Sequence, residues 1–277
     1  LKINPKFIQA YQNKGVAVEK LGDLEGAILC YDKAISIDPK YSAAYFNRGY
    51  VLDRLLRFEE ALANYDKAIE LSPDSIDTRW NRSLLLLCSG DFENGWREYE
   101  TRLRLKKAVV HFDRAKIKSH EWLGISQSIN KKTILVRSEQ GLGDTIQFCR
   151  YIKILKSMGG NVVLEAQPPL LNLLRNIEGL DSIINQGDPL PEYDYYCNLM
   201  SLPYLLGTTI HTIPNEVPYI KADSEKVRMW GEKLGPKKSK RVGLVWSGGF
   251  RPDQPELWPI NKRRNIELAP VSYTHLT

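Results

Sequence analysis

The sequence predicts two kinds of fold in one chain, an α-helical solenoid over residues 1–105 and an α/β lobe with a parallel sheet over residues 133–236. Three observations lead to this expectation. An internal repeat runs through the first hundred residues, and short apolar runs alternate with helical spacing after Thr133. A glycine-rich turn then joins the first apolar run to the first helix of that region. At 277 residues the chain has room for about two domains of ~100–200 residues.

The repeat is a set of small residues, tyrosines and prolines that recur at an offset of 34 positions. That period is typical of tetratricopeptide repeats (TPRs), in which each helical hairpin buries its apolar face against its neighbours. The small residues let the two helices of a pair approach closely, the tyrosines fill the gap between pairs, and the prolines end each second helix. The matching pairs are Gly15 and Gly49, Ala27 and Ala61, Tyr31 and Tyr65, Ala34 and Ala68, and Pro39 and Pro73.

The third repeat departs from this pattern. Gly95 and Tyr99 keep the register, Trp80 is displaced by one position, and Arg102 stands where an alanine is expected. Such a repeat is typical of a solenoid that ends against another structure. Because residues 1–7 align at the same offset with residues 35–41, the chain is expected to be a fragment whose solenoid continues upstream.

Asparagine recurs at the repeat spacing, as Asn13, Asn47 and Asn81 on the first helix of each pair. A carboxamide both donates and accepts hydrogen bonds, so a ladder of asparagines on the concave face could hold the backbone of an extended peptide. The alternative is that these side chains bond neighbouring helices. The sequence leaves both interpretations open.

The α/β region opens with a strand at residues 133–136, a turn containing Gly141 and Gly143, and a helix. Unpaired backbone N–H groups at that helix start can bind an anion or a polar substrate group beside Asp144. Residues 106–132 form a connector, in which Trp122 is expected to pack the solenoid onto the lobe. The remaining predicted elements are strands at 161–166, 181–185 and 193–198, helices at 168–177 and 224–234, and a segment at 214–220 that closes on a sheet edge.

Three blocks of the sequence carry a resemblance to a known family: the TPR repeats, SEQGLGDTIQFCRY from Ser138, and GLVWSGG from Gly243. Together they resemble bacterial TPR proteins with a heptosyltransferase-like glycosyltransferase domain, and the layout is similar to that of O-linked N-acetylglucosamine transferases. The resemblance implies a GT-B enzyme. Residues 133–236 would then form its Rossmann-like N-terminal lobe, and residues 237–269 the truncated start of the donor-binding lobe. Residues 270–277 fit neither pattern and are expected to be a non-native tail.

The resemblance also implies roles for individual residues. Asp144 would be the base for the acceptor hydroxyl, in a loop with Gln140, Gly141 and Gly143, although the same aspartate could simply cap its helix. Glu139, Arg150 and Arg137 could contact the acceptor or form ordinary ion pairs. The donor diphosphate would bind Ser247, Gly248, Gly249 and Arg264. Alternatively, residues 247–249 form an ordinary strand–helix turn and Arg264 is a surface arginine without a ligand. The family's asparagine ladder strengthens the peptide interpretation.

Composition excludes several other classes of protein. The net charge of +6 comes from scattered basic residues, so no nucleic-acid partner is predicted. Gly141-x-Gly143 has Ile146 where the dinucleotide fingerprint needs a third glycine, and no Walker A sequence is present. The histidines have no metal-binding spacing, and the four cysteines are expected to be reduced and buried. The sequence contains no apolar run of ~18 residues, so no membrane span is predicted, and a cytoplasmic setting is expected.

The predicted function is transfer of a sugar from a nucleotide-sugar to a protein or glycan acceptor that the solenoid recruits. The nucleotide-sugar would be a co-substrate, and no bound cofactor or metal is expected. This chain alone is expected to be inactive because most of the donor lobe is missing. The alternative is a TPR scaffold for protein–protein interaction with a catalytically silent Rossmann-like lobe.

Overall fold

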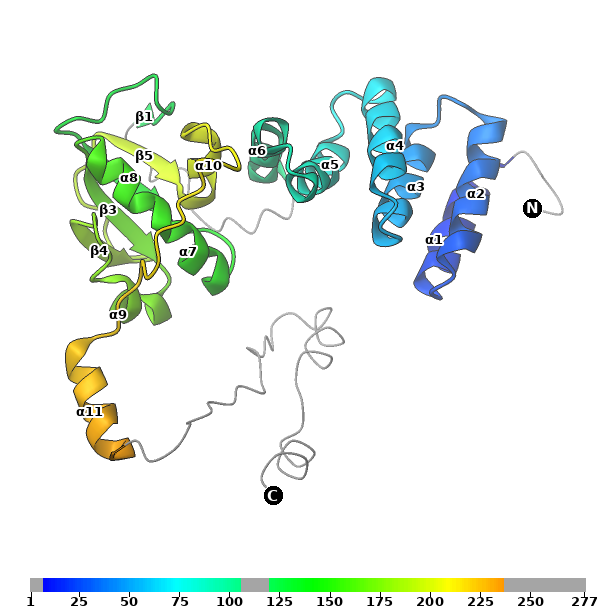
Figure 1. Cartoon of the computed structure of the whole chain (residues 1–277). Helices are drawn as coiled ribbons and strands as arrows, with labels where there is room; N and C mark the ends of the chain where they lie inside the picture. Colours follow the sequence, from blue (N-terminus) through cyan, green and yellow to red (C-terminus); the bar gives the residue numbers. More distant parts are fainter. Residues whose placement is uncertain (1–6, 106–119, 237–277) are drawn as a thin grey trace. The chain divides into compact units, whose positions relative to one another are not determined.

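The computed structural model describes residues 7–105 and 120–236 (Figure 1). The chain divides into one unit that ends at Lys221 and a second that begins at Ala222. In the first unit, six helices pack as three consecutive helical hairpins, as the 34-residue spacing predicts. They are α1 (Ile8–Lys20), α2 (Leu24–Ile37), α3 (Ser42–Arg54), α4 (Phe58–Leu71), α5 (Ile76–Ser89) and α6 (Phe92–Tyr99), followed by the 3₁₀ turn η1 (Glu100–Arg104).

The repeated glycines pack against the repeated tyrosines. Tyr31 and Tyr65 are both fully buried. A Cβ atom at Gly15 would come within 2.5 Å of the Tyr31 ring, and one at Gly49 within 3.0 Å of the Tyr65 ring. The small residues therefore allow the close helix approach that the repeat pattern predicts.

Polar side chains link one repeat to the next with the same period. Arg48 pairs with Asp32 of the preceding repeat and donates from Nε to Asn64 Oδ1 at 2.8 Å. Thirty-four positions later, Arg82 pairs with Asp66 and donates from Nε to Glu98 Oε2 at 2.8 Å. Each arginine thus joins its own repeat to the one before it.

The lobe contains a five-stranded, entirely parallel sheet in the order β1-β5-β2-β3-β4. The chain runs outward from β2 through β3 to β4, then returns to the other side of β2 as β5. The point where strand order reverses therefore lies between β2 and β5. The strands are β1 (His120–Glu121), β2 (Thr133–Arg137), β3 (Asn161–Ala166), β4 (Ser182–Asn185) and β5 (Tyr195–Asn198).

Helical segments of the lobe are shorter than the sequence predicts. The first helix is divided into α7, η3 and α8, and the predicted helix at 168–177 is reduced to η4 and α9. Residues 214–220 were expected to close on a sheet edge, but they form no strand; the edge next to β5 is instead taken by β1 from the expected connector. The segments are α7 (Leu142–Phe148), η3 (Cys149–Tyr151), α8 (Ile152–Ser157), η4 (Pro168–Leu170), α9 (Leu171–Leu174), η5 (Leu199–Ser201) and α10 (Leu202–Leu205).

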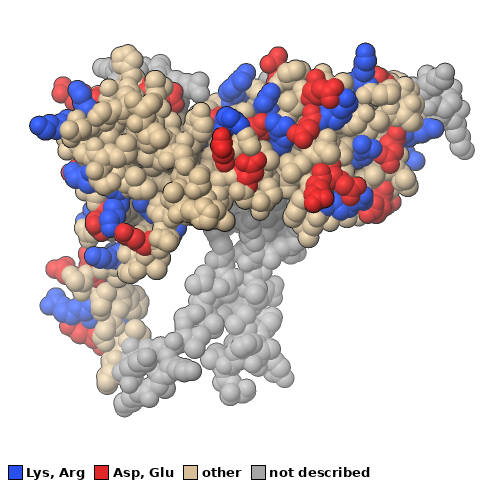
Figure 2. Space-filling view, turned by 45° about the horizontal axis from the view of Figure 1, so that its top comes forward, with Lys and Arg blue, Asp and Glu red and all other residues tan. Residues whose placement is uncertain are grey.

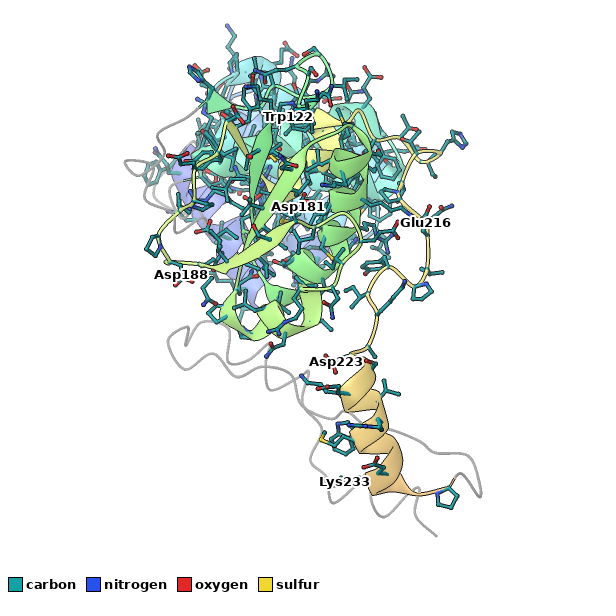
Figure 3. All side chains as sticks on the ribbon, turned by 90° about the vertical axis from the view of Figure 1, so that its left-hand side faces the viewer. Trp122, Asp181, Asp188, Glu216, Asp223 and Lys233 are labelled. Carbon is teal, nitrogen blue, oxygen red and sulfur yellow. The ribbon has the colours of Figure 1, made fainter. Side chains whose placement is uncertain are left out.

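The core of the lobe extends into the last repeat. Trp122 is fully buried among the sheet residues, and its Nε1 donates to the Gln127 carbonyl at 2.9 Å (Figure 3). Tyr99 belongs to this same buried cluster, and Trp96 packs against it with its ring 5.9 Å from that of Phe148. The second unit contains one described helix, α11 (Ser224–Leu234), which begins after Asp223 and buries none of its residues.

Candidate functional site

The glycine turn follows β2, at the carboxyl end of the sheet. Gln140 has a φ of 63°, Gly141 is the N-cap of α7 with a φ of −84°, and Gly143 lies inside the helix. The left-handed residue is therefore Gln140. The expectation that Gly141 and Gly143 supply the backbone freedom is wrong in this respect, since Gly141 has an ordinary φ and a Cβ at Gly143 would meet nothing within 4 Å.

Asp144 lies in the first turn of α7 and is half-buried. Its Oδ2 accepts a hydrogen bond from the Gly141 N–H at 2.8 Å. The carboxylate thus caps its own helix from the third position, and its negative charge lies at the positive end of a helix dipole. This contact is compatible with a second role as a base, which stays a prediction.

Gln140 connects the turn to the solenoid. Its Nε2 lies 3.2 Å from the Tyr99 hydroxyl, and its carbonyl accepts from Gln167 Nε2 at 3.3 Å. Tyr99 occupies the repeat position of Tyr31 and Tyr65, whose hydroxyls have no hydrogen-bond partner among the described residues. The third tyrosine therefore has a contact that the first two lack. Burial raises the pKa of Tyr99, an effect that the contacts with Gln140 and Arg102 oppose.

Glu139 forms a buried ion pair with Arg102. The two residues are 3% and 2% exposed, and Arg102 Nη2 and Nε lie 2.6 and 3.3 Å from Glu139 Oε1 and Oε2. The Met200 N–H also donates to Glu139 Oε1 at 3.3 Å. Burial raises the pKa of Glu139, and the guanidinium of Arg102 opposes this rise. Of the two interpretations of Glu139, the structure shows the ion pair, which joins the turn to the solenoid.

Arg102 also explains the irregular third repeat. Its Nη2 donates to Ser201 Oγ at 2.8 Å, and its Nη1 pairs with Glu100. Glu100 holds the repeat position of Asp32 and Asp66, each of which pairs with an arginine of the next repeat. Here Glu100 instead accepts from Arg102 and, at 2.9 Å, from Ser201 Oγ of the lobe. The lobe thus takes the place of a fourth repeat.

The other two arginines make ordinary structural contacts. Arg137 pairs with Glu165 across β2 and β3, and both side chains are buried. Arg150 donates from Nη1 to the Pro214 carbonyl at 2.8 Å and lies 4.5 Å from the centre of the Tyr219 ring.

Sequence reasoning missed several polar side chains at the carboxyl edge of the sheet. Thr145 Oγ1 donates to Gln167 Oε1 at 2.9 Å, and Gln186 Nε2 donates to the Ser138 carbonyl at 2.9 Å. Gln167 and Gln186 each follow the last residue of a predicted strand, and that position was the available signal.

The asparagines Asn13, Asn47 and Asn81 lie on α1, α3 and α5, as expected. Asn13 is exposed, and the other two are half-buried. Asn81 Nδ2 donates to the Asp77 carbonyl of its own helix at 2.8 Å, and within the described part of the chain none of the three side chains bonds a neighbouring helix. Figure 2 shows positive and negative side chains interspersed over one face of the solenoid, without a region of single sign.

The remaining predicted groups divide into described and undescribed residues. Ser247, Gly248, Gly249 and Arg264 lie outside the described residues, as does the boundary at 237. Within residues 7–105 and 120–236, no three His, Cys, Asp or Glu side chains gather in a way that could hold a metal, and every helix is too short or too polar to cross a bilayer.

Three of the four cysteines are buried as expected, with burial raising the pKa of Cys149 to about 12, whereas Cys88 is exposed. The expectation of a buried thiol is wrong for Cys88.

Comparisons with known proteins support the solenoid. A TPR repeat model matches residues 20–55, and a tetratricopeptide repeat model matches residues 42–75. The protein FlbA of Caulobacter vibrioides is 26% identical over 181 residues, covering 58% of this chain; the chain spans only 29% of FlbA.

Solved TPR structures also match. The TPR protein YrrB is 21% identical with a TM-score of 0.36, covering 38% of this chain and 55% of its own. The first TPR domain of Spaghetti, bound to an HSP90 peptide, is 24% identical with a TM-score of 0.35, covering 37% of this chain and 82% of its own. The N-terminal part of the chain therefore consists of tetratricopeptide repeats, which are followed by a parallel sheet with helices.

Proposed function

We propose that this chain is part of a TPR-containing glycosyltransferase of GT-B type, which transfers a sugar from a nucleotide-sugar to a protein or glycan acceptor. The observation that carries this proposal is the position of Asp144. It lies in the first turn of α7, directly after the loop that follows β2, and ligands of open parallel sheets bind at the carboxyl edge of the strands. A carboxylate there can accept the proton of an acceptor hydroxyl.

The contacts between the solenoid and the turn support the same function. Tyr99 bonds Gln140 and Arg102 bonds Glu139, so two consecutive residues before Gly141 are held by the last repeat. An acceptor bound along the solenoid would therefore be delivered next to Asp144. Because the acceptor would already be held beside the base before the reaction, less entropy would be lost in reaching the transition state.

Arg102 restricts where a substrate can lie. Its guanidinium bonds Glu139, which follows β2, and Ser201, which follows β5, and so fills the space between these two strand ends. The acceptor would then occupy the opposite side of the turn, toward β3, where the half-buried Gln167 offers a carboxamide. Gln140, Gly141 and Gly143 would line it, and the donor would depend on Ser247, Gly248, Gly249 and Arg264.

The test of the enzyme is turnover of nucleotide-sugars by a full-length homologue, compared with variants at the positions of Asp144 and Asp23. Asp144→Asn keeps an oxygen for the Gly141 N–H but removes the base, so turnover should fall by about 10²–10⁴-fold while the fold is retained. Asp23→Asn is the control, because Asp23 also caps a helix with its carboxylate, as the N-cap residue of α2 that accepts from the Gly26 N–H at 2.8 Å. Its turnover should equal that of the wild type.

The second candidate is a scaffold with a silent lobe, and one observation favours it: the Asp144 carboxylate already serves as a helix cap. On this account the Asp144→Asn protein would keep any turnover that the wild type has, and isothermal titration would detect no nucleotide or nucleotide-sugar binding. Either result with intact protein removes the main support for the enzyme.

The peptide-binding role of the asparagines is tested separately. Asn47→Ala and Asn81→Ala should each weaken binding of an acceptor peptide by roughly 5–10-fold, as expected for the loss of one or two hydrogen bonds. The control is Ser36→Ala, since the only partner of the Ser36 hydroxyl among the described residues is the Lys33 carbonyl on the same helix. Unchanged affinity in both asparagine variants would assign these residues a structural role alone.

A further inference from the structure

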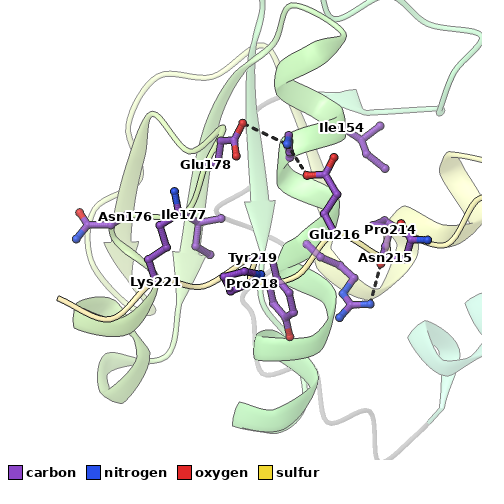
Figure 4. Close-up of a pocket in the computed structure, with 12 residues that line it drawn as sticks. Ile154, Asn176, Ile177, Glu178, Pro214, Asn215, Glu216, Pro218, Tyr219 and Lys221 are labelled. Atoms are coloured by element: carbon purple, nitrogen blue, oxygen red, sulfur yellow. Dashed lines mark hydrogen bonds and ion pairs between the residues drawn. The ribbon is translucent and has the colours of Figure 1, made fainter. Parts of the chain in front are cut away.

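The segment of chain that precedes α11 is attached to the lobe. Lys153 of α8 pairs with Glu216, and Arg150 donates to the Pro214 carbonyl (Figure 4). The same four residues line a cavity of about 210 Å³ between this segment and α8. These contacts hold the chain before α11, whereas α11 itself begins at Ser224 in the second unit and buries none of its residues.

One side of α11 is an exposed apolar face. It consists of Val227, Trp230 and Leu234, which are 57%, 49% and 54% exposed. Because an α-helix turns by about 100° per residue, these three side chains lie within about 60° of one another. An exposed apolar stripe on an otherwise polar helix is typical of a helix that binds another surface.

The charged residues of α11 are arranged around this apolar face. Lys226 and Lys233 lie at one border of it, and Lys233 Nζ is 4.7 Å from the centre of the Trp230 ring. Glu225 and Glu232 lie on the opposite side, about 170° from the middle of the face. Lysine stems can lie along apolar surface while their ammonium groups remain in a polar layer. A partner that meets the apolar face of α11 therefore also meets positive charge.

Basic residues predominate from α11 onward in the sequence. Between positions 226 and 241 there is one acidic residue, Glu232, and Asp223 before them is bound as the N-cap of the helix. The last four basic residues lie outside the described part of the chain and enter only through their charge. Clusters of about four to eight lysines and arginines on an amphipathic helix are typical of sites for anionic lipids. This cluster has seven: Lys226, Arg228, Lys233, Lys237, Lys238, Lys240 and Arg241.

The apolar face and the basic residues together favour one class of partner. A nucleic acid would attract the basic residues but would leave the apolar face in water. An anionic membrane surface satisfies both, because the apolar side chains enter the boundary between headgroups and acyl chains while the lysines reach the lipid phosphates. Tryptophan is also enriched at this depth of a bilayer, which fits Trp230 at the centre of the exposed face.

We propose that α11 binds the surface of an anionic membrane, lying in the plane of the headgroups with Val227, Trp230 and Leu234 turned toward the acyl chains. With 11 residues the helix is too short to cross a bilayer, which takes about 20, so the attachment is peripheral. The proposal is independent of the transferase reaction, since α11 contains none of the residues assigned to it.

Co-sedimentation of the whole chain with lipid vesicles tests the proposal. Vesicles of phosphatidylcholine with about 30% phosphatidylglycerol should bind the protein at least about tenfold more strongly than vesicles of phosphatidylcholine alone, because the basic residues are attracted to the anionic headgroups. Raising the NaCl concentration from about 0.05 M to about 0.5 M should remove most of this difference by screening the charges.

Two variants of equal net charge separate the apolar face from simple charge attraction. Val227→Glu places a carboxylate on the face, whereas Met229→Glu places it almost opposite, since two positions turn the helix by about 200°. Both wild-type side chains are about half exposed or slightly more, at 57% and 52%. Val227→Glu should bind anionic vesicles at least about tenfold more weakly than Met229→Glu, and Trp230→Ala should bind at least about fivefold more weakly than the wild type.

Thermal unfolding shows whether these variants keep the fold, and unchanged melting temperatures are expected because α11 buries none of its residues. Absence of binding to anionic vesicles would overturn the proposal. So would equal binding by Val227→Glu and Met229→Glu, which would mean that charge alone attracts the protein. A melting temperature lowered in Val227→Glu but not in Met229→Glu would also overturn it, because the face would then be covered by protein.

Discussion

Arg102 replaces a packing residue of the repeat with a charged one. Ala34 and Ala68 occupy the same repeat position, fully or almost fully buried, and Arg102 is 2% exposed. Burial of a guanidinium requires partners that compensate for lost hydration, and here Glu139, Glu100 and Ser201 provide them. Arg102 is thus one of the residues that attach the lobe to the last repeat, together with Tyr99 and Trp96.

Removing either partner of the Arg102–Glu139 pair should be strongly destabilising. Arg102→Met leaves Glu139 buried without its cation, and Glu139→Gln leaves Arg102 without its main anion, so each should lower the free energy of unfolding by about 3–5 kcal/mol. Urea denaturation of the whole chain measures this.

The double variant Arg102→Met/Glu139→Gln provides the control. It should lose less than the sum of the single variants, because the pair is removed together. An additive double-mutant cycle would show that the two side chains do not interact in solution. Arg57→Met serves as a surface comparison, since losing the exposed pair of Arg57 with Glu60 should change the free energy of unfolding far less than losing the buried pair does.

Sequence reasoning located the turn but not its geometry. The spacing of apolar residues predicted the strand and helix on either side of it, because those patterns are local. The left-handed conformation falls on Gln140, next to the glycine that was expected to adopt it. The partner of Glu139 was also hidden, since Arg102 lies 37 positions earlier and only tertiary folding brings the two together.

At the scale of the helix pair, Gly15 and Gly49 test how tightly the repeats pack. Gly→Ala normally favours a helix by up to about 1 kcal/mol, but a Cβ at Gly15 would lie 2.5 Å from the Tyr31 ring. Gly15→Ala should therefore destabilise the protein by about 1–3 kcal/mol, and Gly49→Ala, with its nearest contact at 3.0 Å, by less. Thermal unfolding followed by circular dichroism measures both.

The comparison for these variants is Gly231→Ala on α11, where a Cβ would meet nothing within 4 Å. It should be neutral or slightly stabilising. If Gly15→Ala were also stabilising, the close packing between Gly15 and Tyr31 would not exist in solution.

At the scale of the sheet, Asp194 joins the starts of β5 and β2. Its Oδ2 accepts from the Thr133 N–H at 2.8 Å, and its Oδ1 from Lys132 Nζ at 2.9 Å. These hydrogen bonds, that of Thr133 first, lower the pKa of Asp194 below its ordinary value of 3.8. A group with a lowered folded-state pKa contributes stability above its unfolded pKa and loses it as the pH falls.

The wild type should therefore lose its advantage over Asp194→Asn as the pH drops below about 4, where the unfolded chain begins to bind the proton. Urea midpoints of both proteins between about pH 6 and pH 2.5 report the difference. A constant difference across this range would mean that the carboxylate of Asp194 is not bonded in its ionised form. Asp188→Asn is the control, since no comparable pair of bonds involves that residue within the described chain.

The elements that the sequence predicted well are those with strong periodicity. The helix pairs follow from the 34-residue spacing, and α11 has the predicted bounds of Ser224–Leu234. β1 was missed because a strand of two residues is too short to show an alternation of apolar and polar side chains. The lengths of the helices after β2 and β3 were overestimated because the helical spacing of apolar residues continues through the 3₁₀ turns η3 and η4.

At the scale of the molecule, the last repeat of the solenoid and the lobe share one buried core. Repeats stabilise mainly their nearest neighbours, so a change in the first repeat should have effects that decline along the solenoid. A change in the third repeat is different, because Trp96 and Tyr99 pack with Phe148 and the sheet. A destabilising change in the third repeat should therefore also destabilise the lobe, whereas a change in the first repeat should not.

Hydrogen exchange of two variants tests this distinction. Trp96→Ala removes a large side chain at the contact and should lower the protection of amides in both α6 and α7, by up to about 3 kcal/mol in local opening free energy. Tyr31→Ala, a similar truncation of a fully buried ring, should lower protection in α1 and α2 while α7 keeps its own. If α7 were equally protected in Trp96→Ala and wild type, the lobe would unfold independently of the repeats. Acceptor binding to the solenoid could then not be coupled to the turn through this packing.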